Sequence, residues 1–201
     1  MASVTIVNIG YRSTNYWVVS AGRSRLLVDL GWPGTMGTLR ANLARMGVPL
    51  EELRYGLATH YHPDHAGLAQ ELKDAGMPLL VVDVQTSAIP LLARLMKPQD
   101  HFVEIRTHDN VTITVAESRA LLQGIGLSGE IVHTPGHSAD SVSLVLDDGA
   151  VFVGDLTLPA MADDGNIDVV KASWRLLRDR GATRVYPAHG PAQPTGFPSS
   201  E

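Results

Sequence analysis

The order of hydrophobic and polar positions predicts strands near both ends of the chain, with helices between and after them. Short runs rich in β-branched and aromatic residues, bounded by turn residues, indicate β-strands. Three of them follow one another as a meander and six more come later, over 4–10, 16–21, 24–31, 53–60, 78–83, 129–134, 141–148, 150–155 and 184–190. Apolar residues at helical spacing predict helices over 37–47, 66–76, 87–97, 116–126 and 168–181, and turn residues predict a β-turn region over 106–114. This order fits two sheets packed face to face with helices outside.

The composition is that of a globular protein without cysteine. The chain has 201 residues, 44% hydrophobic and 18% charged, which suits one domain over 1–201 with a short disordered tail from about residue 193. Because cysteine is absent, a metal ion would be held by nitrogen and oxygen. No apolar run is long enough for a membrane span and no secretory signal is visible, so we expect a cytoplasmic protein. A net charge of −5 without a Lys/Arg run argues for a small-molecule partner rather than nucleic acid.

The most informative segment is THYHPDHAG, residues 59–67, which places three histidines and an aspartate within six positions. His60 and His62 are one residue apart where a strand ends, so both side chains can point to the same side. Asp64 and His65 fall where the chain turns into a helix, and neighbouring helical side chains diverge by about 100°. One loop can therefore direct two groups to one point and two to a neighbouring point. Because a zinc ion usually takes about four ligands, two ions would need further residues from elsewhere.

Three further residues of ligand type lie directly after predicted strands. His137 follows a strand and a turn in HTPGHS, Asp155 ends FVGD, and His189 ends YPAH. A strand end followed by a loop is where a rigid scaffold can present a side chain. With these residues the chain resembles the metallo-β-lactamase superfamily of binuclear metal hydrolases, in which an H-x-H-x-D-H motif precedes these positions in this order.

The resemblance implies both a fold and a ligand set. The fold would be a four-layer αββα sandwich, with the metals in a shallow groove along one edge of the two sheets. The first metal would be bound by His60, His62 and His137, the second by Asp64, His65 and His189, and Asp155 would bridge both. Asp64 would also act in catalysis by orienting the attacking group. Asp29, in LLVDLG, would hydrogen-bond a ligand imidazole.

The implied reaction is hydrolysis by a hydroxide that bridges two metal ions. Two cations lower the pKa of a shared water, polarise a carbonyl or phosphoryl oxygen and stabilise the leaving group. Nitrogen at His62 favours zinc, because relatives with a di-iron redox centre typically have a carboxylate in that place. Iron or manganese stays open, as does an iron-dependent redox enzyme such as a persulfide dioxygenase. A metal-binding module without catalytic activity is a further alternative.

The leading hypothesis for the substrate is a small ester, thioester or lactone, because the chain is short and acidic. Glyoxalase II carries a helical domain after the last ligand, whereas barely a dozen residues follow His189 here. Ribonuclease Z relatives carry a protruding arm and a basic surface, and neither is visible. Phosphodiesterase and β-lactamase activities on the same dimetal site stay open.

Two segments are candidates for the substrate wall. Trp32 lies in a Trp-Pro-Gly loop of the kind that borders the groove in relatives, so it is either part of the substrate wall or a surface staple. In the helix predicted over 87–97, Leu91 and Leu95 lie on a second apolar stripe. A helix that covers one face of a sandwich needs only one such stripe. The second stripe therefore meets a deeper part of the core, the substrate, or a second subunit of a homodimer, and relatives favour the last two.

Overall fold

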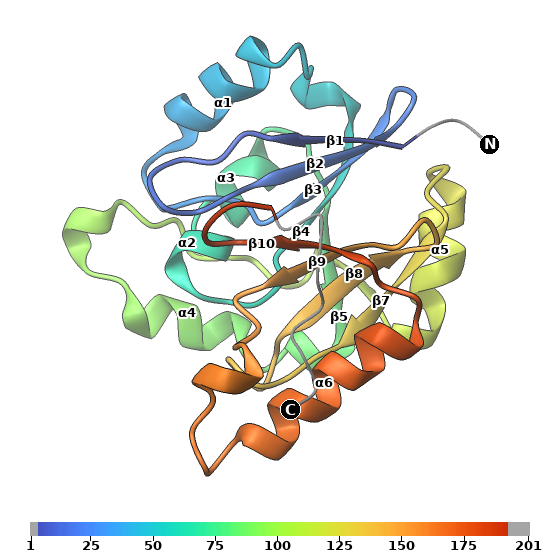
Figure 1. Cartoon of the computed structure of the whole chain (residues 1–201). Helices are drawn as coiled ribbons and strands as arrows, with labels where there is room; N and C mark the ends of the chain where they lie inside the picture. The colour runs from blue at the N-terminus through green and yellow to red at the C-terminus, as the bar shows by residue number, and fades with distance from the viewer. Residues whose placement is uncertain (1–3, 193–201) are drawn as a thin grey trace.

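Two β-sheets face each other in the middle of the molecule, with helices on both outer faces (Figure 1). The computed structural model describes residues 4–192, so the tail predicted from about residue 193 lies outside the described residues. One sheet has six strands in the order β1-β2-β3-β4-β5-β6, and the other has four in the order β10-β9-β8-β7. The strands are β1 (Val4–Asn8), β2 (Trp17–Ala21), β3 (Ser24–Val28), β4 (Leu53–Leu57), β5 (Leu79–Val82), β6 (Val111–Ile113), β7 (Gly129–His133), β8 (Val142–Leu146), β9 (Ala150–Gly154) and β10 (Arg184–Pro187).

The direction of the strands brings several of their C-terminal ends to one edge. The first three strands form the predicted antiparallel meander, and β3, β4, β5 and β6 are then parallel. In the other sheet β9 and β10 are parallel, while β8 is antiparallel to both β7 and β9. The strands β7, β9 and β10 therefore end at the same edge of their sheet.

Alternation along the strands divides the apolar core into layers. In β2, Val18 packs into the cluster outside the six-stranded sheet, whereas Trp17 belongs to the core between the sheets. In β9, Phe152 enters the core between the sheets, and Val151 and Val153 pack on the opposite side, with α6. The division follows because successive side chains of a strand point to opposite faces.

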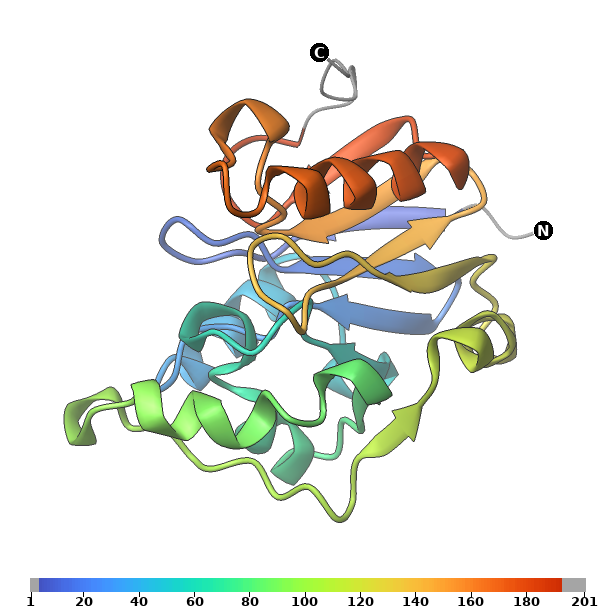
Figure 2. The same cartoon turned by 90° about the horizontal axis from the view of Figure 1, so that it is seen from below.

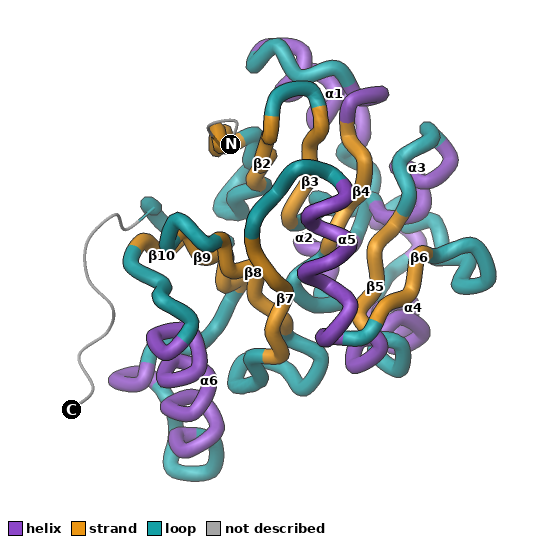
Figure 3. The backbone as a smooth tube through the Cα atoms, turned by 90° about the vertical axis from the view of Figure 1, so that its right-hand side faces the viewer, coloured by secondary structure: helices purple, strands orange, loops and turns teal. Residues whose placement is uncertain are grey.

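Helices on the outer faces complete the αββα sandwich, as expected. Buried residues of α1, α3 and α4 join the cluster outside the six-stranded sheet, and α6 covers the other sheet (Figures 1 and 2). Figure 3 shows α5 beside β7. The α-helices are α1 (Met36–Arg45), α2 (Pro63–Ala66), α3 (Ala69–Asp74), α4 (Ile89–Leu95), α5 (Ser118–Gly124) and α6 (Ile167–Asp179). Short 3-10 helices are η1 (Leu50–Glu52), η2 (Asp83–Gln85), η3 (Pro98–Asp100), η4 (Val115–Glu117) and η5 (Pro159–Met161).

None of the helices within residues 4–192 is both long and apolar enough to cross a membrane.

Two predicted segments differ in detail from the structure. The helix predicted over 66–76 is divided into α2 and α3, because Leu68 leaves the helical conformation with φ −100° and ψ 6°. The break accompanies full burial of the Leu68 side chain. The predicted β-turn region over 106–114 ends in a strand, since Val111 and Ile113 pair with β5.

The two sheets meet closely where β4 and β9 end. The backbone N–H of Val142 donates to the carbonyl oxygen of Thr59 at 2.8 Å. Gly154 has a φ of +57°, and a Cβ atom there would lie 2.3 Å from the hydroxyl oxygen of Thr59. Such a conformation and such an approach both favour glycine. The predicted ligand residues extend from this edge.

Replacement of Phe152 by alanine tests the core between the sheets. Phe152 is fully buried, and its ring lies 4.9 Å from that of Tyr186 and 6.2 Å from that of Trp17. We expect Phe152→Ala to lower the free energy of unfolding by about 3–5 kcal/mol in urea denaturation, because a cavity would remain between the sheets. Val169→Ala, at an exposed position of α6, is the control and should cost less than about 0.5 kcal/mol. Similar small losses for both variants would contradict this placement.

Candidate metal centre

The first predicted ligand group converges on one point. In the loop between β4 and α2, the Nε2 atom of His60 lies 3.0 Å from Nδ1 of His62. In the loop between β7 and β8, Nε2 of His137 lies 3.1 Å from the same His62 nitrogen. One ring nitrogen of each of the three imidazoles thus lies within 4.8 Å of the other two.

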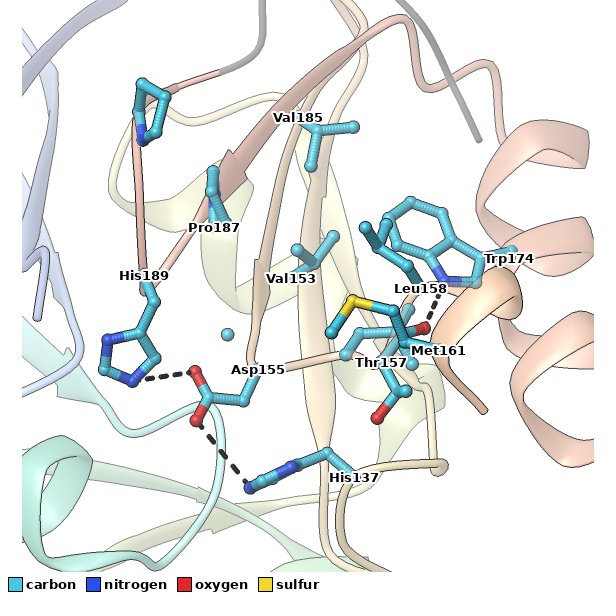
Figure 4. Close-up of a pocket in the computed structure, with 13 residues that line it drawn as sticks. His137, Val153, Asp155, Thr157, Leu158, Met161, Trp174, Val185, Pro187 and His189 are labelled. Carbon is cyan, nitrogen blue, oxygen red and sulfur yellow. Dashed lines mark hydrogen bonds and ion pairs between the residues drawn. The ribbon is translucent and has the colours of Figure 1, made fainter. Parts of the chain in front are cut away.

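The second predicted group converges beside the first. The Nε2 atoms of His65 and His189 each lie 3.3 Å from Oδ2 of Asp64. Asp155, directly after β9, stands between the groups: its Oδ1 lies 3.3 Å from His189, and its Oδ2 lies 3.4 Å from His65 and 3.7 Å from His137. Figure 4 shows the Asp155 carboxylate between the His137 and His189 rings. The structure therefore brings together all seven residues predicted as ligands.

The chemistry of these atoms fits divalent cations. The ligand atoms form three groups, and within each group they lie within 4.8 Å of one another. The groups are His60 with His62 and His137, His60 with His65 and Asp155, and Asp64 with His65 and His189. Among the described residues, buried Oδ1 of Asp155 and both ring nitrogens of His65 have no partner with hydrogen-bond geometry. Buried polar atoms normally have a partner, and imidazole nitrogen and carboxylate oxygen are the donors that zinc and similar ions take. The groups can therefore hold metal ions.

Asp29 directly follows β3 and contacts both His65 and Thr59 next to the cluster. Its Oδ2 lies 3.1 Å from Nδ1 of His65, and its Oδ1 accepts hydrogen bonds from the backbone N–H and the hydroxyl of Thr59, both at 2.8 Å. A proton on Nδ1 of His65 leaves Nε2 of that ring to face the ligand atoms. Asp29 is therefore next to the ligand imidazole that was expected, at ion-pair distance, and the predicted hydrogen bond between them stays a prediction.

Two other imidazoles are oriented by groups that the sequence did not indicate as functional. Nδ1 of His60 lies 3.2 Å from the hydroxyl of Thr59, and Nδ1 of His189 lies 2.8 Å from the carbonyl oxygen of Ser13. The hydroxyl of Thr14 donates to Oδ2 of Asp64 at 3.0 Å. Thr59 could have been suspected because it precedes His60. The loop between β1 and β2, which holds Ser13 and Thr14, carries no local signal.

Electrostatics favour positive charge in the second group. Burial, and then the neighbouring rings of His65 and His62, hold the pKa of His60 well below its usual value. Burial alone would also lower the pKa of His65, but Asp29, Asp155 and Asp64 raise it well above its usual value. For Asp64, burial is outweighed by His65 and Thr14, which lower its pKa to about 2. The carboxylates thus stabilise a cation at the point where they meet His65.

The remaining predicted residues lie in different surroundings. Trp32 is partly buried against the outer cluster of the six-stranded sheet, with the Arg12 guanidinium 5.6 Å from its ring, and its role as a substrate wall stays a prediction. Leu91 and Leu95 are exposed, so the second stripe of the α4 segment is not part of the core. Tyr61, which was not among the predicted residues although it lies between His60 and His62, is 3% exposed and packs in the outer cluster of the six-stranded sheet.

A cavity of about 430 Å³ adjoins Asp155. Val153, Val185 and Trp174 lie along it, and Leu158 and Met161 come from the segment after β9 (Figure 4). The ligand candidates in its wall are Asp155, His137 and His189. Largely apolar surface with a few convergent polar groups is typical of a small-molecule site.

A second cavity, of about 400 Å³, lies beside His62. Its lining includes Leu91 and Leu95 of α4, and Ser138 and Asp140 of the segment after His137. The predicted substrate-wall leucines are therefore placed next to a ligand candidate.

The sequence matches a known family over most of its length. The family model of the metallo-β-lactamase superfamily matches residues 9–189. The chain belongs to this superfamily. A metallo-β-lactamase family protein from Thermus thermophilus superposes with a TM-score of 0.70 at 19% identity, over 94% of this chain and 74% of that chain, which shows the shared fold.

Curated relatives of this superfamily member are longer proteins. The beta-lactamase-like protein 2 homolog of Caenorhabditis elegans is 28% identical over 184 residues, which cover 90% of this chain and 57% of the relative. The atrochrysone carboxyl ACP thioesterase of Aspergillus terreus is 26% identical over 183 residues, which cover 89% of this chain and 50% of the relative. The chain thus spans about half the length of these relatives.

Replacement of Asp29 by asparagine tests how the superfamily motif is supported. Asparagine keeps an oxygen for Thr59 but turns an NH2 group toward Nδ1 of His65, where the carboxylate now lies. We expect zinc affinity, measured by competition with a chromophoric chelator, to fall about 10–100-fold while the circular dichroism spectrum is unchanged. Asp147→Asn, at a surface ion pair with Arg119, is the control and should leave zinc affinity unchanged. Unchanged affinity in Asp29→Asn would show that the contact does not orient a ligand.

Proposed function

We propose that this protein is a metal-dependent hydrolase that uses two divalent cations, with zinc as the native metal. The observation that carries the proposal is the position of Asp155, whose carboxylate oxygens face both the His137 side and the His65–His189 side of the cluster. A single site would not need two sets of ligand atoms joined by one carboxylate. The five histidines in these sets favour zinc over calcium or magnesium, which prefer oxygen.

The seven residues divide between two ions in the proposed centre. His60, His62 and His137 would hold the first, Asp64, His65 and His189 the second, and Asp155 both. When bound, two such ions supply an activated water and polarise the oxygen of the group under attack.

The side chains around the centre prepare the reaction. Asp64 stays ionised and keeps one oxygen engaged with Thr14, so its carboxylate has a fixed direction and can accept a hydrogen bond from the attacking water. Asp29 and Thr59 hold His65 and His60 in place before substrate arrives. Such fixed groups need little reorganisation during the reaction.

The substrate proposed is a carbonyl compound, with a thioester first, then an ester or lactone. The apolar cavity beside Asp155 suits an acyl chain, and the relative from Aspergillus terreus is named as a thioesterase. Hydrolysis would break the bond between the acyl carbon and sulfur, transfer the oxygen of water to the acyl group, and leave a carboxylic acid and a thiol. The net charge of −5 does not favour polyanionic substrates.

Metal analysis tests the dimetal centre. Protein purified without chelators should contain close to two equivalents of metal, mainly zinc, in elemental analysis, and chelation should abolish hydrolysis until zinc is restored. Asp155→Ala should lose both metal content and hydrolysis, because one carboxylate serves both groups. Asp168→Ala, at an exposed position of α6, is the control and should retain both. One equivalent of iron without zinc, or full hydrolysis by Asp155→Ala, would overturn the proposal.

A substrate panel tests the reaction class. Acyl thioesters, aryl esters, lactones, β-lactams and bis-nitrophenyl phosphate are compared at equal zinc loading by kcat/KM. We expect the best value for a thioester or another non-lactam carbonyl substrate, because the apolar cavity stabilises the acyl group. A clear preference for the phosphodiester or for β-lactams would instead support one of those activities. Oxygen uptake with a persulfide and iron-loaded protein would support the redox alternative.

A further inference from the structure

Helix α4 turns two leucines away from the core. Ile89 and Leu92 are buried against the outer cluster of the six-stranded sheet, whereas Leu91 and Leu95 are 49% and 55% exposed. Residues four apart lie on the same side of a helix, so the two leucines form one apolar strip. A single exposed leucine is common on protein surfaces. This strip, however, forms a wall of the cavity beside His62, which we call the α4 cavity.

The lining of the α4 cavity also has polar residues. They include Ser87, just before α4, Ser138 from the segment after His137, and Asp140, the one acidic residue among the described residues of the lining. The Asp140 carboxylate is already engaged, because it accepts a hydrogen bond from the backbone N–H of Tyr61 at 2.8 Å. This bond also fastens the loop that carries His137 to the loop that carries the histidine motif. The α4 cavity therefore suits an uncharged occupant with an apolar body and some hydrogen-bonding capacity.

The first ligand group separates the α4 cavity from the cavity beside Asp155. His62 lines the α4 cavity, His137 lines the other, and their facing nitrogens are 3.1 Å apart. Each of these two adjacent rings thus borders one of the cavities, and we call the pair the His62–His137 ridge. A substrate whose reacting bond lies over this ridge would extend one arm into each cavity.

The chemistry of the walls distinguishes the two arms. The cavity beside Asp155 has Val153, Leu158, Met161 and Trp174 along it, which favour a hydrocarbon chain. The α4 cavity combines leucines with hydroxyl groups. We infer that the α4 cavity binds the leaving group of the substrate, an uncharged thiol or alcohol with an apolar body, while the acyl chain occupies the cavity beside Asp155.

This inference rests on the proposed hydrolase function and assigns the ends of its substrate. Cleavage breaks the bond from the acyl carbon to sulfur or oxygen. The oxygen of water remains on the acid, and the released thiol or alcohol receives a proton from water and departs from the α4 cavity.

Two thioester series test the assignment with the zinc-loaded protein. One keeps the acetyl group and changes the leaving group from ethanethiol to hexanethiol, and the other keeps ethanethiol and lengthens the acyl group from acetyl to hexanoyl. In Leu91→Asp and Leu95→Asp, KM for the hexanethiol ester should rise about tenfold relative to the ethanethiol ester, because a charge replaces apolar wall, with the acyl series unchanged. Met161→Asp, on η5 beside the other cavity, is the matched variant and should affect the acyl series alone. An effect of the leucine variants on the acyl series, or on neither series, would overturn the inference.

A binding measurement separates this inference from the proposed activity. A non-cleavable ketone, with a methylene group in place of sulfur and a hexyl chain on the leaving-group side, is titrated into the zinc-loaded protein by calorimetry. The wild type should bind it about tenfold more tightly than Leu95→Asp or the milder Leu95→Ser, whose melting temperatures confirm folding. Equal binding would overturn the inference even if hydrolysis is observed, whereas a lack of turnover with selective binding would overturn only the proposed function. Dimeric wild type with monomeric leucine variants and unchanged binding would identify the strip as a subunit contact instead.

Discussion

The candidate site depends on the buried carboxylate of Asp29. Its backbone has a φ of +62°, a left-handed conformation that aspartate tolerates better than most side chains do, and its N–H donates to the carbonyl oxygen of Leu57 in β4. From this position one carboxylate oxygen accepts two hydrogen bonds from Thr59 and the other faces Nδ1 of His65. Thr59 in turn contacts Nδ1 of His60. The Asp29 carboxylate thus fixes the Nδ1 side of both rings, directly for His65 and through Thr59 for His60, so that the Nε2 atoms face the other ligand candidates. Loss or displacement of the Asp29 carboxylate would therefore affect both proposed metal positions at once.

The proposed centre also lies at a junction between the two sheets. Four of the ligand candidates lie in the loop and helix α2 that follow β4 of the six-stranded sheet, and the segments after strands of the four-stranded sheet carry His137, Asp155 and His189. Gly154 allows the end of β9 to approach Thr59, so that Asp155 reaches the histidine motif. Metal ions held by both sets would join the two sheets at this edge. Binding to the folded state alone stabilises that state, so we infer that the centre contributes to stability as well as to chemistry.

Sequence patterns predicted the parts of the structure that depend on local spacing. Runs of β-branched and aromatic residues bounded by turn residues identified every described strand except β6, and the dense motif around His60 identified one side of the centre. The contacts that orient the ligand candidates could not be predicted from local patterns, because they join residues far apart in the sequence. Thr14 and Asp64 are 50 positions apart, and Ser13 and His189 are 176 positions apart. The break at Leu68 was missed for a related reason: helical spacing does not report how deeply one side chain must be buried in the tertiary structure.

The ligand candidates and the walls of the two cavities come largely from different segments. The residues proposed for the reaction can therefore differ from those that select the substrate. The ligand candidates stand at strand ends and in short loops that are hydrogen-bonded to one another, so their positions leave little freedom. The two cavities are shaped instead by α4 and by the segment from β9 to α6, which contribute surface side chains such as Leu95 and Met161. Leu95 and Met161 make none of the contacts that orient Asp29 or Asp155 in the centre. Members of one superfamily can therefore keep the same seven residues while differing in substrate, and in this chain the walls on either side of the His62–His137 ridge are the features from which selectivity is best argued.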